Sequence, residues 1–168
     1  RYLIADSYRR SGEEAREKLK KDLVESARAA RSKKVRETLN AALAQYKQVQ
    51  DLLNRRQEEA ALVPLEKAML RNCYFSLGDV LFELEQYEAA VKAYSLAASR
   101  YQNAPEVLEA CLQMARAYQR MSKPSEARSV LEQAKGVRGR MKADAPFSET
   151  TNHSREEWAQ LLAQTSVL

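Results

Sequence analysis

Large and very small side chains follow one another in a fixed order that occurs twice in the chain, 37 residues apart. The paired positions are Tyr74 and Cys111, Leu77 and Met114, Gly78 and Ala115, Leu81 and Tyr118, Ala90 and Ala127, Tyr94 and Leu131, and Ala97 and Ala134. Each pair keeps its size class. Spacings of three and four indicate helices, and small residues at matched places predict close helix crossings. The pattern therefore predicts two similar helical hairpins that stack as repeats.

The composition favours an all-α fold. The 168 residues include only four glycines and four prolines, and no strand-like alternation of Val, Ile and Thr occurs. Good helix formers such as Ala, Leu, Glu and Lys dominate. Hydrophobic residues make up 45% and charged residues 30%, which is typical of a folded chain. No apolar run reaches the roughly 18–20 residues that a membrane-spanning helix needs.

Residues 71–136 resemble the tetratricopeptide repeat, an antiparallel helix pair of about 34 residues. With Arg71 counted as the first position, the large and small residues listed above fall where that family has them. Gly78 then lies where helix A passes closely by helix B of its own repeat. The resemblance implies an α-α superhelix whose A helices line a concave, partner-binding face.

The spacer at residues 99–105, SRYQNAP, adds three residues to the standard repeat. It is similar to the spacers of the bacterial Tol-Pal coordinator and of outer-membrane assembly lipoproteins, with Gln102 where those proteins have proline. This similarity implies the bacterial periplasm or cell envelope, with the cytoplasm as the alternative. Because the chain begins at Arg1 in mid-pattern, we expect a fragment of a larger protein.

The first 63 residues predict a degenerate repeat with unusually long helices. Ile4, Ala5 and Tyr8 fall on helix-A positions. We expect a turn at Gly12, with a capping box at 11–14 that starts the second helix. An apolar stripe follows, made of Val35, Leu39, Ala42, Tyr46, Val49 and Leu53. The sequence RSKK at 31–34 interrupts the pattern, so residues 13–58 form either one helix or two.

Helix signals divide the rest of the chain. We expect Pro64 in the first turn of a helix, Asn103 as a helix cap, and a capping box at 154–157. The expected helices cover 65–84, 87–101, 105–121 and 124–136, and a loop covers 137–152. A last helix would place Trp158 on the final repeat as a cap. The predicted regions are 1–63, then 64–136 with repeats at about 71–104 and 108–139, then 137–168.

The predicted binding site is the concave face of the two A helices. The family resemblance assigns to it Asn72, Phe75, Asp79, Phe82, Glu83, Glu109, Leu112, Arg116, Gln119 and Arg120. The phenylalanines would be apolar anchors for another protein or peptide, and the arginines would pair with its acidic residues. In the alternative, the long N-terminal helices cover both phenylalanines. The function predicted is a non-catalytic interaction scaffold.

Other function classes have less support. Basic residues of the N-terminal helices could follow phosphates or an anionic surface, but no aromatic residues are interleaved to stack bases. They are Arg9, Arg10, Lys18, Lys20, Lys21, Arg31, Lys33, Lys34 and Arg36. The apolar stripe from Val35 to Leu53 could instead pair between two copies of the chain, giving a homo-oligomer.

Catalysis and cofactor binding lack a motif. His153 is the one histidine, and the common phosphate-binding glycine motifs are absent. Cys73 and Cys111 lack the spacing of a zinc site and lie on apolar helical faces, so we expect buried free thiols. The chain is therefore predicted to have no enzymatic activity, no cofactor, no metal and no small-molecule substrate.

Overall fold

The computed structural model describes residues 1–19 and 25–165, and in that part of the chain it contains helices and no strand. The contacts divide the chain into two compact units, residues 1–86 and 87–168. The predicted all-α repeat fold is confirmed, and each unit is described by itself. The helices are α1 (Tyr2–Leu19), α2 (Glu25–Glu59), α3 (Pro64–Glu83), α4 (Tyr87–Arg100), α5 (Glu106–Arg120), α6 (Pro124–Arg140), α7 (Phe147–Thr150) and α8 (Arg155–Thr165).

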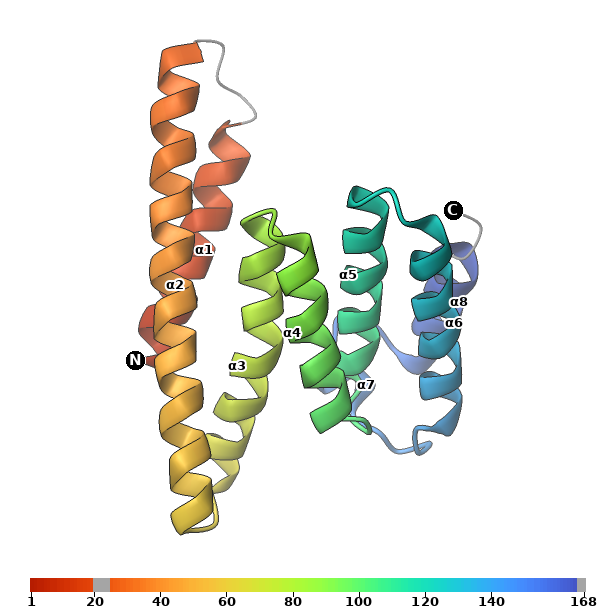
Figure 1. Cartoon of the computed structure of the whole chain (residues 1–168). Coiled ribbons are helices and arrows are strands. Elements are labelled where there is room, and N and C mark those ends of the chain that lie inside the picture. The colour runs from red at the N-terminus through yellow and green to blue at the C-terminus, as the bar shows by residue number, and fades with distance from the viewer. Residues whose placement is uncertain (20–24, 166–168) are drawn as a thin grey trace. The chain divides into compact units, whose positions relative to one another are not determined.

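In the first unit, α1 and α2 form an antiparallel hairpin, and α3 packs against both (Figure 1). The whole predicted stripe of α2 is buried, from Val35 to Leu53. The stripe therefore packs within the chain and is not exposed for pairing with a second copy, as the homo-oligomer prediction would require. The sequence at 31–34 does not break the helix, because it lies inside α2. The junction between α1 and α2 falls at residues outside the described ranges.

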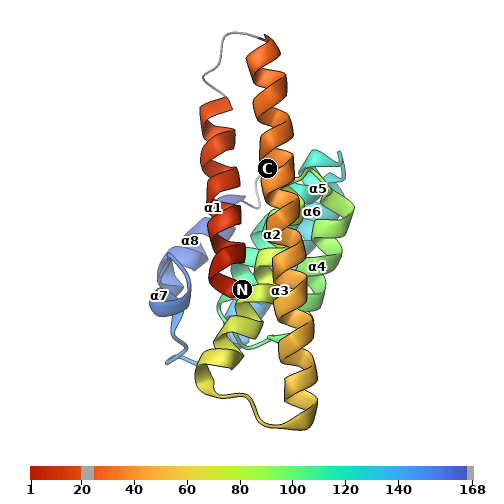
Figure 2. The same ribbon diagram turned by 90° about the vertical axis from the view of Figure 1, so that its left-hand side faces the viewer.

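Gly12 marks a close helix crossing and not a turn, so the predicted turn is wrong. Helix α1 continues through Gly12 to Leu19, beside α2 (Figure 2). A Cβ atom at Gly12 would lie 2.8 Å from Cδ2 and 2.9 Å from Cγ of Leu39. The missing side chain thus lets α1 approach α2. The capping box predicted at 11–14 is also wrong, because these residues lie in the interior of α1.

Helix α3 begins as predicted, with Pro64 in its first turn. The backbone N–H of Val63 donates a hydrogen bond to Glu66 Oε2 at 3.1 Å, which satisfies one of the free amides at the helix start. The buried residues of α3 include Tyr74, Leu77 and Gly78. Three of the predicted repeat positions therefore lie in the core.

The turns after α3 and α5 have the same backbone geometry, 37 residues apart. Glu85 and Ser122 both adopt a positive φ, 62° and 58°. In each turn the next amide bonds back to a helical carbonyl, Gln86 to Leu81 and Lys123 to Tyr118, each at 2.9 Å. This is the Schellman ending of a helix, with a residue other than glycine in the left-handed position. The backbone thus repeats as the side-chain pattern does.

In the second unit, α5 packs against both α4 and α6. The small residues predicted at the crossing of α5 and α6 are buried: Ala115 is 1% exposed, Ala127 3% and Ala134 0%. Helix α5 begins at Glu106, and its N-cap is Pro105, with no side-chain hydrogen bond. The prediction that Asn103 caps this helix is therefore wrong.

Helix α6 runs through Gly136 and Gly139 to Arg140, beyond the end predicted at residue 136. The guanidinium of Arg155 donates hydrogen bonds to the carbonyl oxygens of Arg138, Met141 and Lys142 at 2.8–3.2 Å. The last carbonyls of a helix lack partners within it. A cation on these carbonyls stabilises the extra turn.

The C-terminal helix α8 packs against α6, the last helix of the repeats. The capping box predicted at its start is confirmed: Ser154 N donates to Glu157 Oε2 at 2.6 Å, and Glu157 N donates to Ser154 Oγ at 3.2 Å. The hydrogen bond that the Ser154 backbone N–H donates to the Glu157 carboxylate is the main cause that lowers the pKa of Glu157. Trp158 is 0% exposed, and its Nε1 donates to Thr151 Oγ1 at 3.0 Å. The helix that carries Trp158 thus packs against the last helix of the repeats, which is where the sequence predicts a capping helix.

Both cysteines are free and buried, as predicted. Burial raises the pKa of the Cys73 thiol to about 12 and that of Cys111 to about 11. The neutral thiol is the form that the folded chain favours.

We expect Gly12→Ala to lower the free energy of unfolding by about 1 kcal/mol. Crowding Leu39 costs about 1–3 kcal/mol, and the better helix propensity of alanine offsets about 1 kcal/mol. Gly139→Ala is the matched control, because a Cβ there meets nothing within 4 Å. It should raise stability by up to about 1 kcal/mol. Urea unfolding measures both, and an increase in both variants would contradict the crossing at Gly12.

Stability should fall as the solution becomes alkaline. In the folded chain the thiol pKa values lie above the ordinary value of 9.0. The stability that the buried neutral thiols contribute is therefore complete below about pH 9 and is lost as the pH rises through about 11 and about 12. In that window each thiol should lower the free energy of unfolding by about 1.4 kcal/mol per pH unit. A Cys73→Ala/Cys111→Ala variant should show a shallower slope in urea unfolding between pH 9 and 11. Equal slopes would contradict this account.

Candidate functional site

The ten residues predicted for the concave face fall on two helices in different units. Five lie on α3, and all of these are half-buried: Asn72, Phe75, Asp79, Phe82 and Glu83. Five lie on α5, where Arg116, Gln119 and Arg120 are exposed, Glu109 is half-buried and Leu112 is buried. The structure thus brings the residues together in two sets of five. A groove that joins the two sets stays a prediction.

The exposed part of α5 is polar and basic. Arg116, Gln119 and Arg120 are three and four positions apart, so they share one face of the helix. Within residues 1–19 and 25–165, none of these three side chains has a hydrogen bond or an ion pair. Leu112, one turn before Arg116 on the same stripe, is only 4% exposed. It packs in the interior of the unit and does not offer the partner contact that the sequence predicts.

On α3, the predicted site residue Glu83 is already engaged by α1. The guanidinium of Arg16 donates to the Glu83 carboxylate at 2.5 Å and to its carbonyl oxygen at 3.0 Å. It also pairs with Glu85 at 3.2 Å. The alternative in which the N-terminal helices cover α3 therefore has support at this end of the helix. Sequence analysis missed Arg16, because its partner lies 67 residues away and no local motif joins them.

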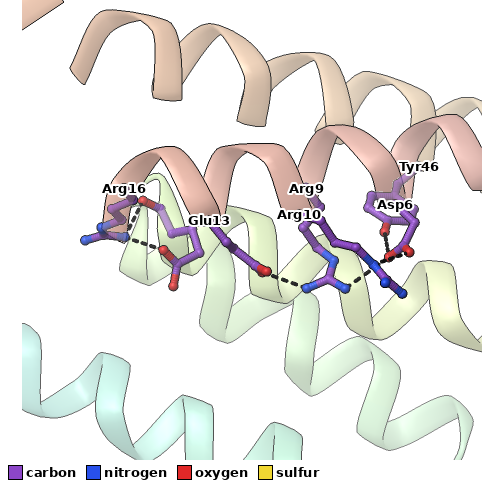
Figure 3. A network of polar contacts seen from close by, with 7 residues as sticks. Asp6, Arg9, Arg10, Glu13, Arg16 and Tyr46 are labelled. Carbon is purple, nitrogen blue, oxygen red and sulfur yellow. Dashed lines mark hydrogen bonds and ion pairs between the residues drawn. The ribbon is translucent and has the colours of Figure 1, made fainter. Parts of the chain in front are cut away.

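Arginines of α1 are neutralised along the helix, as Figure 3 shows. Arg9 pairs with Asp6 at 3.0 Å and with Glu13 at 2.6 Å, and Arg10 pairs with Asp6 at 2.8 Å. Burial raises the pKa of Asp6, but the hydrogen bond and charge of Arg9 outweigh it, so the pKa lies below its usual value. Tyr46 of α2 donates to the same carboxylate at 3.3 Å.

These ion pairs weaken the prediction that the N-terminal helices bind phosphates. Arg9 and Arg10 already have carboxylate partners, and Lys33 lies 4.0 Å from Glu37. Lys34 and Arg36 are exposed and have no ion pair among the described residues, so for these two the prediction stands. Lys20 and Lys21 lie outside the described residues. A phosphate would have to compete with acids that are held close by on the same helix.

No catalytic cluster is formed in the part of the chain that the structure describes. There, no group of three or more His, Cys, Asp and Glu side chains could hold a metal ion. The His153 ring packs edge-on against the Trp158 indole, with 5.2 Å between ring centroids. The buried thiols of Cys73 and Cys111 have raised pKa values, whereas a nucleophilic cysteine needs a lowered one.

The comparisons with known proteins agree with the repeat pattern. A family model of the tetratricopeptide repeat matches residues 72–103 and 108–139. No curated protein and no solved structure shows significant similarity to the chain, so no relative supports the resemblance to bacterial envelope proteins. None of the described helices is long and apolar enough to cross a membrane. Residues 72–103 and 108–139 thus match the tetratricopeptide repeat model, within an all-α helical-repeat fold.

Proposed function

We propose that this chain is a non-catalytic scaffold that binds an acidic segment of another polypeptide along the exposed face of α5. The observation that carries the proposal is the pair of exposed, unpaired guanidiniums of Arg116 and Arg120. They lie on helix A of the second repeat, beside the amide of Gln119. Tetratricopeptide repeats generally mediate contacts between proteins, which supports binding as the role of this face.

The chemistry of this face selects for carboxylates. A guanidinium can donate two parallel hydrogen bonds to one carboxylate, and such charge-assisted bonds are stronger than neutral ones. Two of them one turn apart fit acidic residues on an extended or helical segment. Because the side chains are exposed, they would contribute mainly to the association rate and to selectivity for acidic partners.

The half-buried residues of α3 belong to the other unit and stay a separate predicted set. Phe75 and Phe82 are half-buried, so a partner that binds α3 could bury the rest of their surface as apolar anchors. Asp79 and Glu83 would oppose an acidic residue at that position, and Glu83 is held by Arg16. The acidic segment is therefore proposed for α5 alone.

We expect charge reversal on α5 to abolish selective binding. A peptide library selected on the intact chain should yield sequences rich in Asp and Glu. Arg116→Glu/Arg120→Glu should weaken binding of the selected peptides at least about tenfold, because two charge-assisted contacts become repulsive. Fluorescence anisotropy at low salt measures the affinities, and circular dichroism should show unchanged helix content.

The matched control is Arg128→Glu, which reverses an exposed charge on α6 without touching the α5 face. It should bind the selected peptides as the unaltered chain does. Selection of peptides without acidic residues, or equal losses in the control and the double variant, would contradict the proposal.

A further inference from the structure

The second unit contains a hollow of about 350 Å³ between α4, α5 and α6, away from the residues of the proposed site. Its floor is apolar and carries sulfur: Val107, Cys111 and Met114. Its rim is polar, with Asn103, Gln133 and Arg140. A volume of about 350 Å³ is at the lower end of the range of small-ligand pockets, which is about 300–1,000 Å³.

Arg140 is the charged residue at this rim. In the part of the chain that the structure describes, its guanidinium has no ion pair and no hydrogen bond. A Cβ atom built on Gly136 would lie 3.3 Å from Arg140 Nη1. The guanidinium therefore lies over Gly136, so close that a Cβ there would require it to shift by a few tenths of an ångström.

This placement gives a reason for Gly136. Glycine is less favourable than alanine in the interior of a helix, and α6 continues for another turn beyond this position. At Gly139, by contrast, a Cβ would meet nothing within 4 Å. Nothing in the structure explains Gly139, whereas Gly136 makes room for a cation at the edge of a hollow.

From these observations we propose that the hollow binds a ligand with an aliphatic chain that ends in a carboxylate. The chain would lie on the floor formed by Val107, Cys111 and Met114, and the carboxylate would pair with Arg140. A single planar cation matches a single carboxylate, which accepts two parallel hydrogen bonds from a guanidinium.

Two sources can supply this chemistry, namely a free fatty acid and the C-terminal apolar residue of a polypeptide. Both place an apolar chain beside a carboxylate. The experiment therefore uses sodium octanoate as one probe and a short neutral peptide that ends in leucine as the other. Octanol and the C-terminally amidated peptide are their uncharged controls.

Methionine methyl groups report binding in the full chain. Among the four methionines, Met114 and Met141 line the hollow, whereas Met69 and Met121 do not. With ¹³C-methyl methionine, at least one of the two probes should cause saturable shifts at Met114 and Met141 and leave Met69 and Met121 unchanged. The uncharged control should bind about tenfold more weakly, as the loss of a charge-assisted contact predicts. The probe that binds more tightly identifies the source.

Two variants separate binding from folding. Arg140→Gln should weaken binding of the carboxylate about tenfold and bring it to the level of the uncharged control. Gly136→Ala should displace the guanidinium and weaken binding, without a lower melting temperature, because alanine favours the helix. Arg128→Gln, on an exposed part of α6, is the control and should change neither property.

The proposal is overturned if neither carboxylate causes saturable shifts at Met114 and Met141. It is also overturned if octanol or the amidated peptide binds as tightly as its charged counterpart, or if Arg140→Gln leaves the affinity unchanged. An unchanged affinity in Gly136→Ala would overturn the inference that binding depends on the position of the Arg140 guanidinium over that glycine. None of these results depends on the partner proposed for α5.

Discussion

Close crossings of helices at very small residues hold each unit of this protein together. In the first unit, the absence of a side chain at Gly12 brings α1 onto Leu39 of α2. In the second, Ala115, Ala127 and Ala134 are buried where α5 and α6 pack. Glycine weakens an isolated helix, and an alanine methyl group buries little apolar area of its own. Their value lies in letting the large residues around them reach the partner helix and leave water.

The sequence predicted the crossing of α5 and α6 and mistook the one at Gly12. The buried alanines of the second repeat were predicted because the same size classes stand 37 residues earlier. Gly12 has no such counterpart, and Ser11 and Glu14 beside it have the spacing of a capping box. A glycine at a turn and a glycine at a crossing look alike locally. Only the position of Leu39 in space distinguishes them.

Helix ends that depend on distant residues were also beyond prediction. The last turn of α6 lies past Gly136 and is stabilised by Arg155, which comes from the next long helix. Local chemistry favours a stop at the first glycine, and the tertiary contact overrides it. The turns at Glu85 and Ser122 show the converse, since both take a left-handed conformation without glycine. The rest of the repeat fixes the backbone there.

The candidate site was partly readable from charge spacing, because an arginine on a helix finds its partners three or four residues away. Arg9 has Asp6 and Glu13 at those distances, and the structure pairs it with both. Around Arg116 the same four positions hold no acid: they are Leu112, Gln113, Gln119 and Arg120. Net charge alone cannot make this distinction, since it counts both arginines equally. An arginine without an acidic partner on its own helix, such as Arg116, keeps its charge available to another chain.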